Sequence, residues 1–369
     1  MGLPRKLATI AAVGAILLFL NQLFESGIGD IGINPYYARI VSLIGINITL
    51  AVSLNLINGL AGQFSIGHAG FMAVGGYAAT YLTVYHGQAI AGLVGGTPTA
   101  GVGSAVVMAA SLTVGALAAG LAGLVVGIPS LRLKGDYLAI VTLGFGEIIR
   151  VVILNIPAVG GATGFTAALP ITNFFWIFAV AILTIVIVRN IALSTFGRAL
   201  GAIRSDEVAA DAMGIHTTRY KVLAFVISAG LAGMAGGLWG QLFANPLNPQ
   251  NLNFVKSIEV IVMIVLGGIG SITGAVLGAT TLTILPEALR TFDQQFPGLR
   301  MVMYALLLIL LMIYRPQGIM GRRELSFAWL RRRRPADPAP ATPPPSRPLR
   351  RNRSTPGTGR NDEGGPANG

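Results

Sequence analysis

Long apolar runs recur along the chain and alternate with short polar connections. They lie near residues 7–24, 38–57, 63–85, 104–128, 136–155, 171–189, 220–243, 256–270, 272–288 and 299–315. Several reach or approach the roughly 20 apolar residues with which an α-helix crosses a bilayer. The pattern predicts an all-α polytopic membrane protein with about ten transmembrane helices, the first of which is retained and not cleaved as a signal peptide.

The eighth and ninth runs share one stretch, VIVMIVLGGIGSITGAVLGATTLTIL, that glycines interrupt. A glycine inside a helix is less favourable than alanine by up to about 1 kcal/mol. We therefore expect these helices to be broken. The sequence leaves open whether they cross the membrane twice or form a re-entrant pair.

Composition favours a membrane protein over a soluble one. Apolar residues make up 53% of the chain and charged residues only 11%, whereas soluble domains have about 25% charged residues. There is no cysteine, and His68, His86 and His216 lie far apart in the sequence. These features argue against a disulfide framework, a thiolate metal site and a histidine metal cluster.

Basic residues are concentrated in a few connections and at both ends of the chain. Arg5 and Lys6 precede the first run, and Arg132, Lys134 and the loop at about 190–220 follow later. Because basic loops stay in the cytoplasm, both termini are expected there. Membrane topology thus accounts for the net charge of +12, and no nucleic-acid partner is expected.

Residues 321–369 differ from the transmembrane domain that we expect at 1–320. They are rich in proline and arginine and poor in apolar residues, so we predict a disordered, basic cytoplasmic tail. The arginine run 331–334 has two possible roles. It could bind anionic membrane lipid, or it could simply anchor the topology, which is the more common use of such runs.

One apolar region, NGLAGQFSIGHAGFMAVGGYAA at 58–79, combines six glycines with Gln63, Ser65 and His68. Non-helical backbone persists at membrane depth only where protein or a water-filled cavity satisfies its polar groups. The region is therefore predicted to be a broken helix that lines a translocation path. The alternative is close glycine packing, with the polar side chains bonded to neighbouring helices.

Two further polar features support a path through the protein. Asn47 and Asn58 project within about 20° of each other on one helix, so they form a stripe that should face the protein interior. Glu147 and Arg150 are three residues apart on the fifth predicted helix, with Glu147 near mid-membrane. A lone charge there is costly, so pairing is expected. The pair is either a pore or gate network or a structural ion pair that sets helix register.

The chain lacks an energy source of its own. No G-x-x-x-x-G-K-[ST] loop occurs, and none of the four lysines follows a glycine. The chain is therefore predicted not to be an enzyme and to bind no cofactor. A transporter of this kind must use an ion gradient or a partner ATPase.

The cytoplasmic loop at about 190–220 favours a partner ATPase. It reads as an amphipathic helical segment in which small residues lie among charged ones, a composition suited to docking into a groove of a soluble partner. The residues are Arg204, Glu207, Ala209, Ala210 and Gly214. This segment resembles the coupling loop of ABC-importer permeases, although Glu207 stands one residue earlier than the acid of that pattern.

Five segments together resemble the LivM-type permeases of branched-chain amino-acid ABC importers. They are LNLINGLAGQFSIGHAGFMAVGGY, LRLKGDYLAIVTLGFGEIIR, GRALGAIRSDEVAADAMGI, VLGGIGSITGAVLGA and RPQGIMG, in this order between residues 54 and 321. The resemblance implies import of leucine, isoleucine and valine across a bacterial cytoplasmic (inner) membrane. It also implies a LivH-like sister permease, two ATPase subunits that bind the ATP, and an extracytoplasmic substrate-binding protein.

Three alternatives remain at this point. The same importer class could carry urea or short amides, because no residue of the path identifies the solute. A gradient-driven carrier could use Glu147 as a proton site. A scaffold or receptor that transports nothing could recruit partners through the basic tail.

Overall fold

The computed structural model describes residues 14–22, 34–99, 101–133, 135–165, 171–242, 247–290, 299–315, 317–321 and 324. All of them belong to one unit, Met1–Leu325. Apart from Gly321 and Glu324, the predicted basic tail lies outside the described residues, as does much of the first predicted crossing.

The described residues are almost entirely helical. The main helices are α2 (Pro35–Asn55), α3 (His68–Gly92), α4 (Gly101–Ser130), α5 (Asp136–Leu154), α6 (Phe174–Leu193), α7 (Thr195–Ser205), α8 (Glu207–Ala212), α9 (Thr217–Gly240), α10 (Phe254–Gly267), α11 (Ile272–Ala288) and α13 (Leu299–Tyr314). A π-helical turn, Leu56–Leu60, extends α2. Short 3-10 turns lie at Pro157–Val159, Gly161–Thr163 and Pro249–Leu252.

Five of the described helices are long and apolar enough to cross a membrane. They are Pro35–Leu60, Gly101–Ser130, Asp136–Leu154, Phe174–Leu193 and Thr217–Gly240, and Ile272–Ala288 is a shorter apolar helix. The prediction of an all-α polytopic membrane protein is therefore confirmed. The number of about ten crossings stays a prediction.

Close backbone contacts hold α3, α4 and α9 together. A Cβ atom added at Gly75 would overlap the backbone of Gly233, and one added at Gly236 would overlap the Met72 carbonyl oxygen. Small residues allow such close approach where lipid supplies no hydrophobic driving force between helices. The Phe71 and Phe225 rings meet edge to face, with centroids 5.3 Å apart, so α3 and α9 form the tightly packed centre of the unit.

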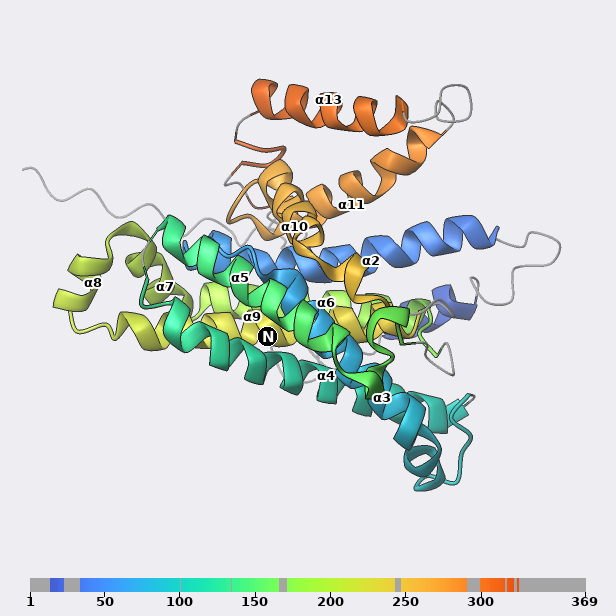
Figure 1. Ribbon diagram of the computed structural model, residues 1–369. Coiled ribbons are helices and arrows are strands. Elements are labelled where there is room, and N and C mark those ends of the chain that lie inside the picture. Colours follow the sequence, from blue (N-terminus) through green and yellow to red (C-terminus); the bar gives the residue numbers. More distant parts are fainter. Residues whose placement is uncertain are drawn as a thin grey trace, which may run out of the picture. The chain divides into compact units, whose positions relative to one another are not determined.

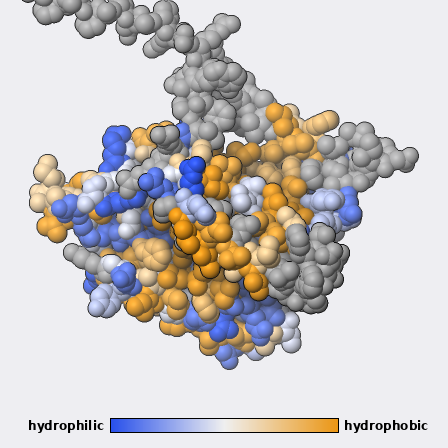
Figure 2. Space-filling model, turned by 90° about the horizontal axis from the view of Figure 1, so that it is seen from above, coloured by the Kyte–Doolittle hydropathy of each residue, from blue (hydrophilic) through white to orange (hydrophobic). Residues whose placement is uncertain are grey.

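The outer faces of the helices are apolar. Leu117, Leu121 and Val125, spaced four residues apart on α4, are 63%, 65% and 69% exposed. Apolar side chains, drawn in orange, also cover much of the face shown in Figure 2. Such a stripe of exposed leucine and valine suits contact with lipid acyl chains.

Figure 1 shows α7 and α8 together at one end of the unit, whereas α10 and α11 lie along α2. The predicted glycine break separates α10 from α11, with φ of +114° at Gly268 and +93° at Gly270. With 14 residues, α10 is about 21 Å long. It is therefore shorter than the roughly 30 Å hydrocarbon core of a bilayer.

Candidate functional site

The predicted broken helix is present between α2 and α3. After the π-helical turn, residues 61–67 are non-helical, and Gly62 has a φ of +68°. Asn58 Oδ1 accepts a hydrogen bond from Ser65 N at 3.2 Å, and Thr142 Oγ1 accepts one from Ile66 N at 3.1 Å. Polar side chains thus satisfy the backbone of the break, which is the requirement for such a segment inside a membrane.

His68 and Ser65 are buried, whereas Gln63 is half-buried. The His68 Nε2 atom lies 2.8 Å from Ser53 Oγ, which also donates to the Leu50 carbonyl at 2.9 Å. Gln63 Nε2 donates to the carbonyl of Ala61 at 3.4 Å. Asn58 and Ser65 are therefore brought together, while His68 belongs to a separate buried cluster on α2.

The predicted stripe of Asn47 and Asn58 faces the protein interior, because both side chains are buried, as is Asn55 on the same helix. Each contacts a different element. Asn47 Nδ2 donates to Thr283 Oγ1 on α11 at 2.9 Å, and Asn55 Oδ1 accepts from Gly270 N at 2.9 Å. The stripe therefore joins α2 to α11, to the α10–α11 turn and to the broken segment.

Asn47 also contacts a second ion pair. Lys256 Nζ lies 3.3 Å from Asn47 Oδ1, 3.0 Å from Glu259 Oε2 and 5.5 Å from the centroid of the Trp239 ring. Asn47 lies near the middle of the span Pro35–Leu60.

Glu147 and Arg150 form the predicted ion pair on α5. Arg150 Nε donates to Glu147 Oε2 at 2.7 Å, and the side chains are 27% and 30% exposed, respectively. The second carboxylate oxygen, Oε1, accepts a hydrogen bond from Phe254 N, the first residue of α10, at 3.3 Å. The carboxylate therefore lies at the positive end of the α10 dipole as well as beside a guanidinium.

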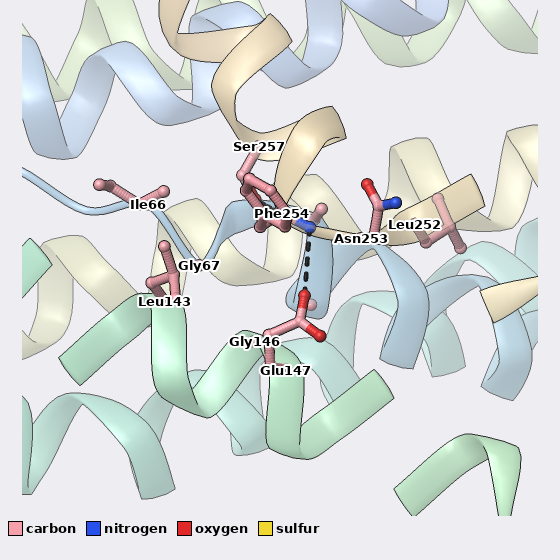
Figure 3. A pocket seen from close by; sticks show the side chains of 11 residues that line it. Ile66, Gly67, Leu143, Gly146, Glu147, Leu252, Asn253, Phe254 and Ser257 are labelled. Carbon is pink, nitrogen blue, oxygen red and sulfur yellow. Dashed lines mark hydrogen bonds between the residues drawn. The ribbon is translucent and has the colours of Figure 1, made fainter. Parts of the chain in front are cut away.

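Glu147 and Phe254 line a small pocket between α3, α5 and the start of α10 (Figure 3). Its walls combine backbone, apolar and polar groups from Ile66, Gly67, Ala69, Gly70, Leu143, Gly146, Glu147, Leu252, Asn253, Phe254 and Ser257. Glycines bring the walls close together: a Cβ added at Gly70 would lie 3.0 Å from Gly146 Cα. The pocket thus places one carboxylate between closely spaced walls of mixed polarity.

The sequence prediction missed that α10 begins beside Glu147. Asn253 Oδ1 accepts from Val255 N at 2.9 Å and from Lys256 N at 3.4 Å, so it is the N-cap of α10. An asparagine directly before an apolar run is a helix-start signal. This signal could have placed the start at residue 254 instead of 256.

At one end of the unit, the predicted cytoplasmic loop forms α7 and α8, as its helical pattern indicated. Asp206 caps α8 by accepting from Val208 N and Ala209 N at 2.9 and 3.0 Å. Glu207 forms an ion pair with Lys221 of α9 at 2.7 Å, and Lys221 is only 2% exposed. Glu207 therefore anchors α8 to α9 within the chain.

The small residues of this loop occupy different environments. Ala210 is buried, whereas Ala209 is exposed and Gly214 forms an exposed turn with a φ of +85°. Val208 and Met213 are 71% and 82% exposed. The loop therefore presents two apolar side chains at the end of the unit.

Arg204 of α7 connects the loop to the membrane-spanning helices. Its Nη1 atom donates to the carbonyl of Gly59 in the π-helical turn. The same nitrogen would lie 3.1 Å from a Cβ at Gly270, in the α10–α11 turn. Arg204 thus joins three elements that are distant in sequence: α7, the end of α2 and the α10–α11 turn.

Among the described residues, no group of three or more histidine, cysteine, aspartate or glutamate side chains could hold a metal ion. The site offers hydrogen-bonding and charged groups within an apolar helical frame.

Comparison with known proteins identifies the type of transporter. Residues 36–312 match the family model described as "Branched-chain amino acid transport system / permease component". The high-affinity branched-chain amino acid permease protein LivM of Salmonella typhimurium is 34% identical over 318 residues, which cover 76% of this chain and 69% of the relative. LivM of Escherichia coli gives the same identity and coverage.

A second type of permease from the same systems is also similar. LivH of Escherichia coli is 40% identical over 135 residues, which cover 37% of this chain and 42% of the relative. No solved structure matches the chain. The resemblance to LivM-type permeases is confirmed, and the chain belongs to the family of membrane-spanning permease components of branched-chain amino acid transport systems.

Proposed function

We propose that this chain imports leucine, isoleucine and valine as one of two permeases in a heterodimer with a LivH-like partner. Two ATPase subunits bind and hydrolyse the ATP, so this chain needs no cofactor of its own, and an extracytoplasmic protein delivers the substrate. As a transport permease, the chain is not an enzyme. The side that carries α8 is the cytoplasmic side of the membrane.

The contact of Arg204 carries this proposal. Through Arg204, α7 touches the π-helical turn of α2 and the α10–α11 turn, and α10 leads from that turn to Glu147 at its other end. A force applied to α7 and α8 therefore has a continuous, packed route to the middle of the membrane-spanning helices. An importer driven by external ATPases requires such a route.

The translocation path, in this proposal, runs along the α5 side of the unit. Glu147 and Arg150 are partly exposed there and offer a negative and a positive group, which complement the ammonium and carboxylate of an amino acid. Asn58 and Ser65 are buried and bond to each other, so they support the broken segment beside the path. Asn47 and His68 are also buried, but they bond to Thr283 of α11 and Ser53 of α2. Gln63, which is half-buried, lies at its edge.

The docking surface can be tested with the exposed residues of α8 and the turn after it. Val208→Glu and Met213→Glu place charges on side chains that are 71% and 82% exposed. An interface residue of this type contributes about 1–2 kcal/mol or more, so ATP-dependent leucine uptake by the reconstituted complex should fall about tenfold or more. The same substitution at the exposed Thr218, on α9, is the matched control.

Co-purification of the ATPase subunits separates loss of docking from misfolding. We expect both glutamate variants to insert and purify normally but to retain less ATPase than the Thr218→Glu control. Full leucine uptake by both variants would refute the proposal that Val208 and Met213 lie in the ATPase docking surface. Competition between leucine and urea in the wild-type assay tests the substrate, since urea should not reduce leucine uptake.

A further inference from the structure

The segment that follows α13 returns to the end of α10. Ile319 N donates to the Leu266 carbonyl at 2.8 Å, and Met320 N donates to the Gly267 carbonyl at 3.1 Å. The last carbonyls of a helix have no partner within the helix. Residues 317–321, which we call the strap, therefore complete the hydrogen bonding of the α10 C-terminus.

The strap approaches the α10–α11 turn backbone to backbone. Gly318 and Gly321 have φ of +79° and +58°. A Cβ added at Gly318 would lie 2.6 Å from Gly268 N, and one added at Gly268 would overlap the Gly321 carbonyl oxygen. Glycine is needed at these positions because a side chain would separate the two backbones.

Glu324 adds a charged contact beyond the strap. Its Oε1 atom accepts from Ile272 N at 2.6 Å, and its Oε2 atom accepts from Thr273 N at 3.3 Å and from Thr273 Oγ1 at 3.1 Å. Ile272 is the first residue of the 17-residue helix α11. A carboxylate at this end of a helix stabilises it through charge-assisted hydrogen bonds and the helix dipole.

The same turn is also held by α2 and α7. Asn55 Nδ2 donates to the Ser271 carbonyl at 3.2 Å, and Asn55 Oδ1 accepts from Gly270 N. Arg204 of α7 lies close to Gly270. The turn is thus contacted both by the strap with Glu324 and by the two residues Asn55 and Arg204.

We infer that Glu324 is a positioning residue for energy coupling: together with the strap, it holds the α10–α11 turn against Arg204, so that movement of α7 and α8 displaces α10. Without the Glu324 contact, the α10–α11 turn shifts away when Arg204 moves, and α10 transmits less of the movement to Glu147 at its other end. This inference rests on the proposed function. It assigns a coupling role to a residue whose sequence surroundings predict disorder.

The test compares Glu324→Ala and Glu324→Asp in the full importer in proteoliposomes. The readout is the number of leucine molecules imported per ATP hydrolysed. Loss of a helix-terminal charge interaction of this kind changes an equilibrium constant about fivefold. Glu324→Ala should therefore lower the number of leucine molecules imported per ATP about fivefold, while ATP hydrolysis continues. Glu324→Asp keeps the charge and should restore most of the ratio.

Glu287→Ala is the matched control, because Glu287 lies near the other end of α11 and accepts a hydrogen bond from Tyr36 at 2.5 Å. A merely structural role of Glu324 would reduce the amount of complex but leave the ratio unchanged, and that result would overturn the inference. If Glu324→Ala does not assemble, the neutral isostere Glu324→Gln is measured in the same way. If even the wild-type complex fails to import leucine, the proposed function is what fails.

Discussion

At the residue scale, charged side chains in this protein are held by specific partners. Glu147 accepts from both Arg150 and the start of α10, and Lys256 is surrounded by Glu259, Asn47 and Trp239. Burial of an unpaired charge in an apolar helical unit is unfavourable by several kcal/mol. Removal of one partner of such a charge should therefore be more unfavourable than the same substitution at an exposed surface position.

Glu147→Gln tests this directly. Glutamine still accepts from Phe254 N, but it loses the charge opposite Arg150, an interaction worth about 1.5–3 kcal/mol. We expect leucine uptake by the importer to fall about tenfold or more, with normal insertion into the membrane. Asp136→Asn, at the exposed start of the same helix, should have little effect, and equal uptake by both variants would exclude a role for Glu147 in the path.

At the element scale, the helices divide into a rigid centre and a region of breaks. Glycine contacts hold α3 against α9, whereas α2 ends in a π-helical turn and α10 ends at Gly267, before the glycine-containing turn that leads to α11. Close packing of small residues resists deformation, while breaks allow a helix to move as a short piece. We infer that α10 moves relative to a fixed α3–α9 centre during transport.

Gly236→Ala tests the rigid centre. The new Cβ would overlap the Met72 carbonyl, and overpacking of this kind destabilises a protein by about 1–3 kcal/mol. The melting temperature of the purified protein in detergent should fall by several degrees. Gly144→Ala adds a Cβ that meets no atom of another element within 4 Å, so the melting temperature should stay the same or rise. A lower melting temperature in both variants would contradict the packing account.

Sequence patterns predicted the features that depend on local composition. Apolar run length revealed the helices, and glycines beside polar residues revealed the break before α3 and the one before α11. The partners of Arg204 could not be predicted, because Gly59 and Gly270 lie far from it in the chain. The contact of Glu324 could not be predicted either, because the sequence places this residue in a tail predicted to be disordered, whereas its carboxylate accepts from Ile272 N at the start of α11.

At the scale of the whole molecule, the proposed function makes the chain a conduit whose energy source lies on other subunits. In this account, α7 and α8 receive the movement, Arg204 passes it to the α10–α11 turn, and α10 carries it to Glu147. The proposed function therefore requires the energy of ATP hydrolysis to enter through α8. The rival account, a gradient-driven carrier with Glu147 as its proton site, needs no such docking surface.

The most direct test is leucine accumulation in liposomes that contain this chain and its sister permease, measured with and without the two ATPase subunits and with ATP and the binding protein supplied. Our account predicts accumulation only when the ATPase subunits and ATP are both present, and no loss of accumulation when a protonophore is added. Uphill uptake without the ATPase subunits, abolished by the protonophore, would contradict it.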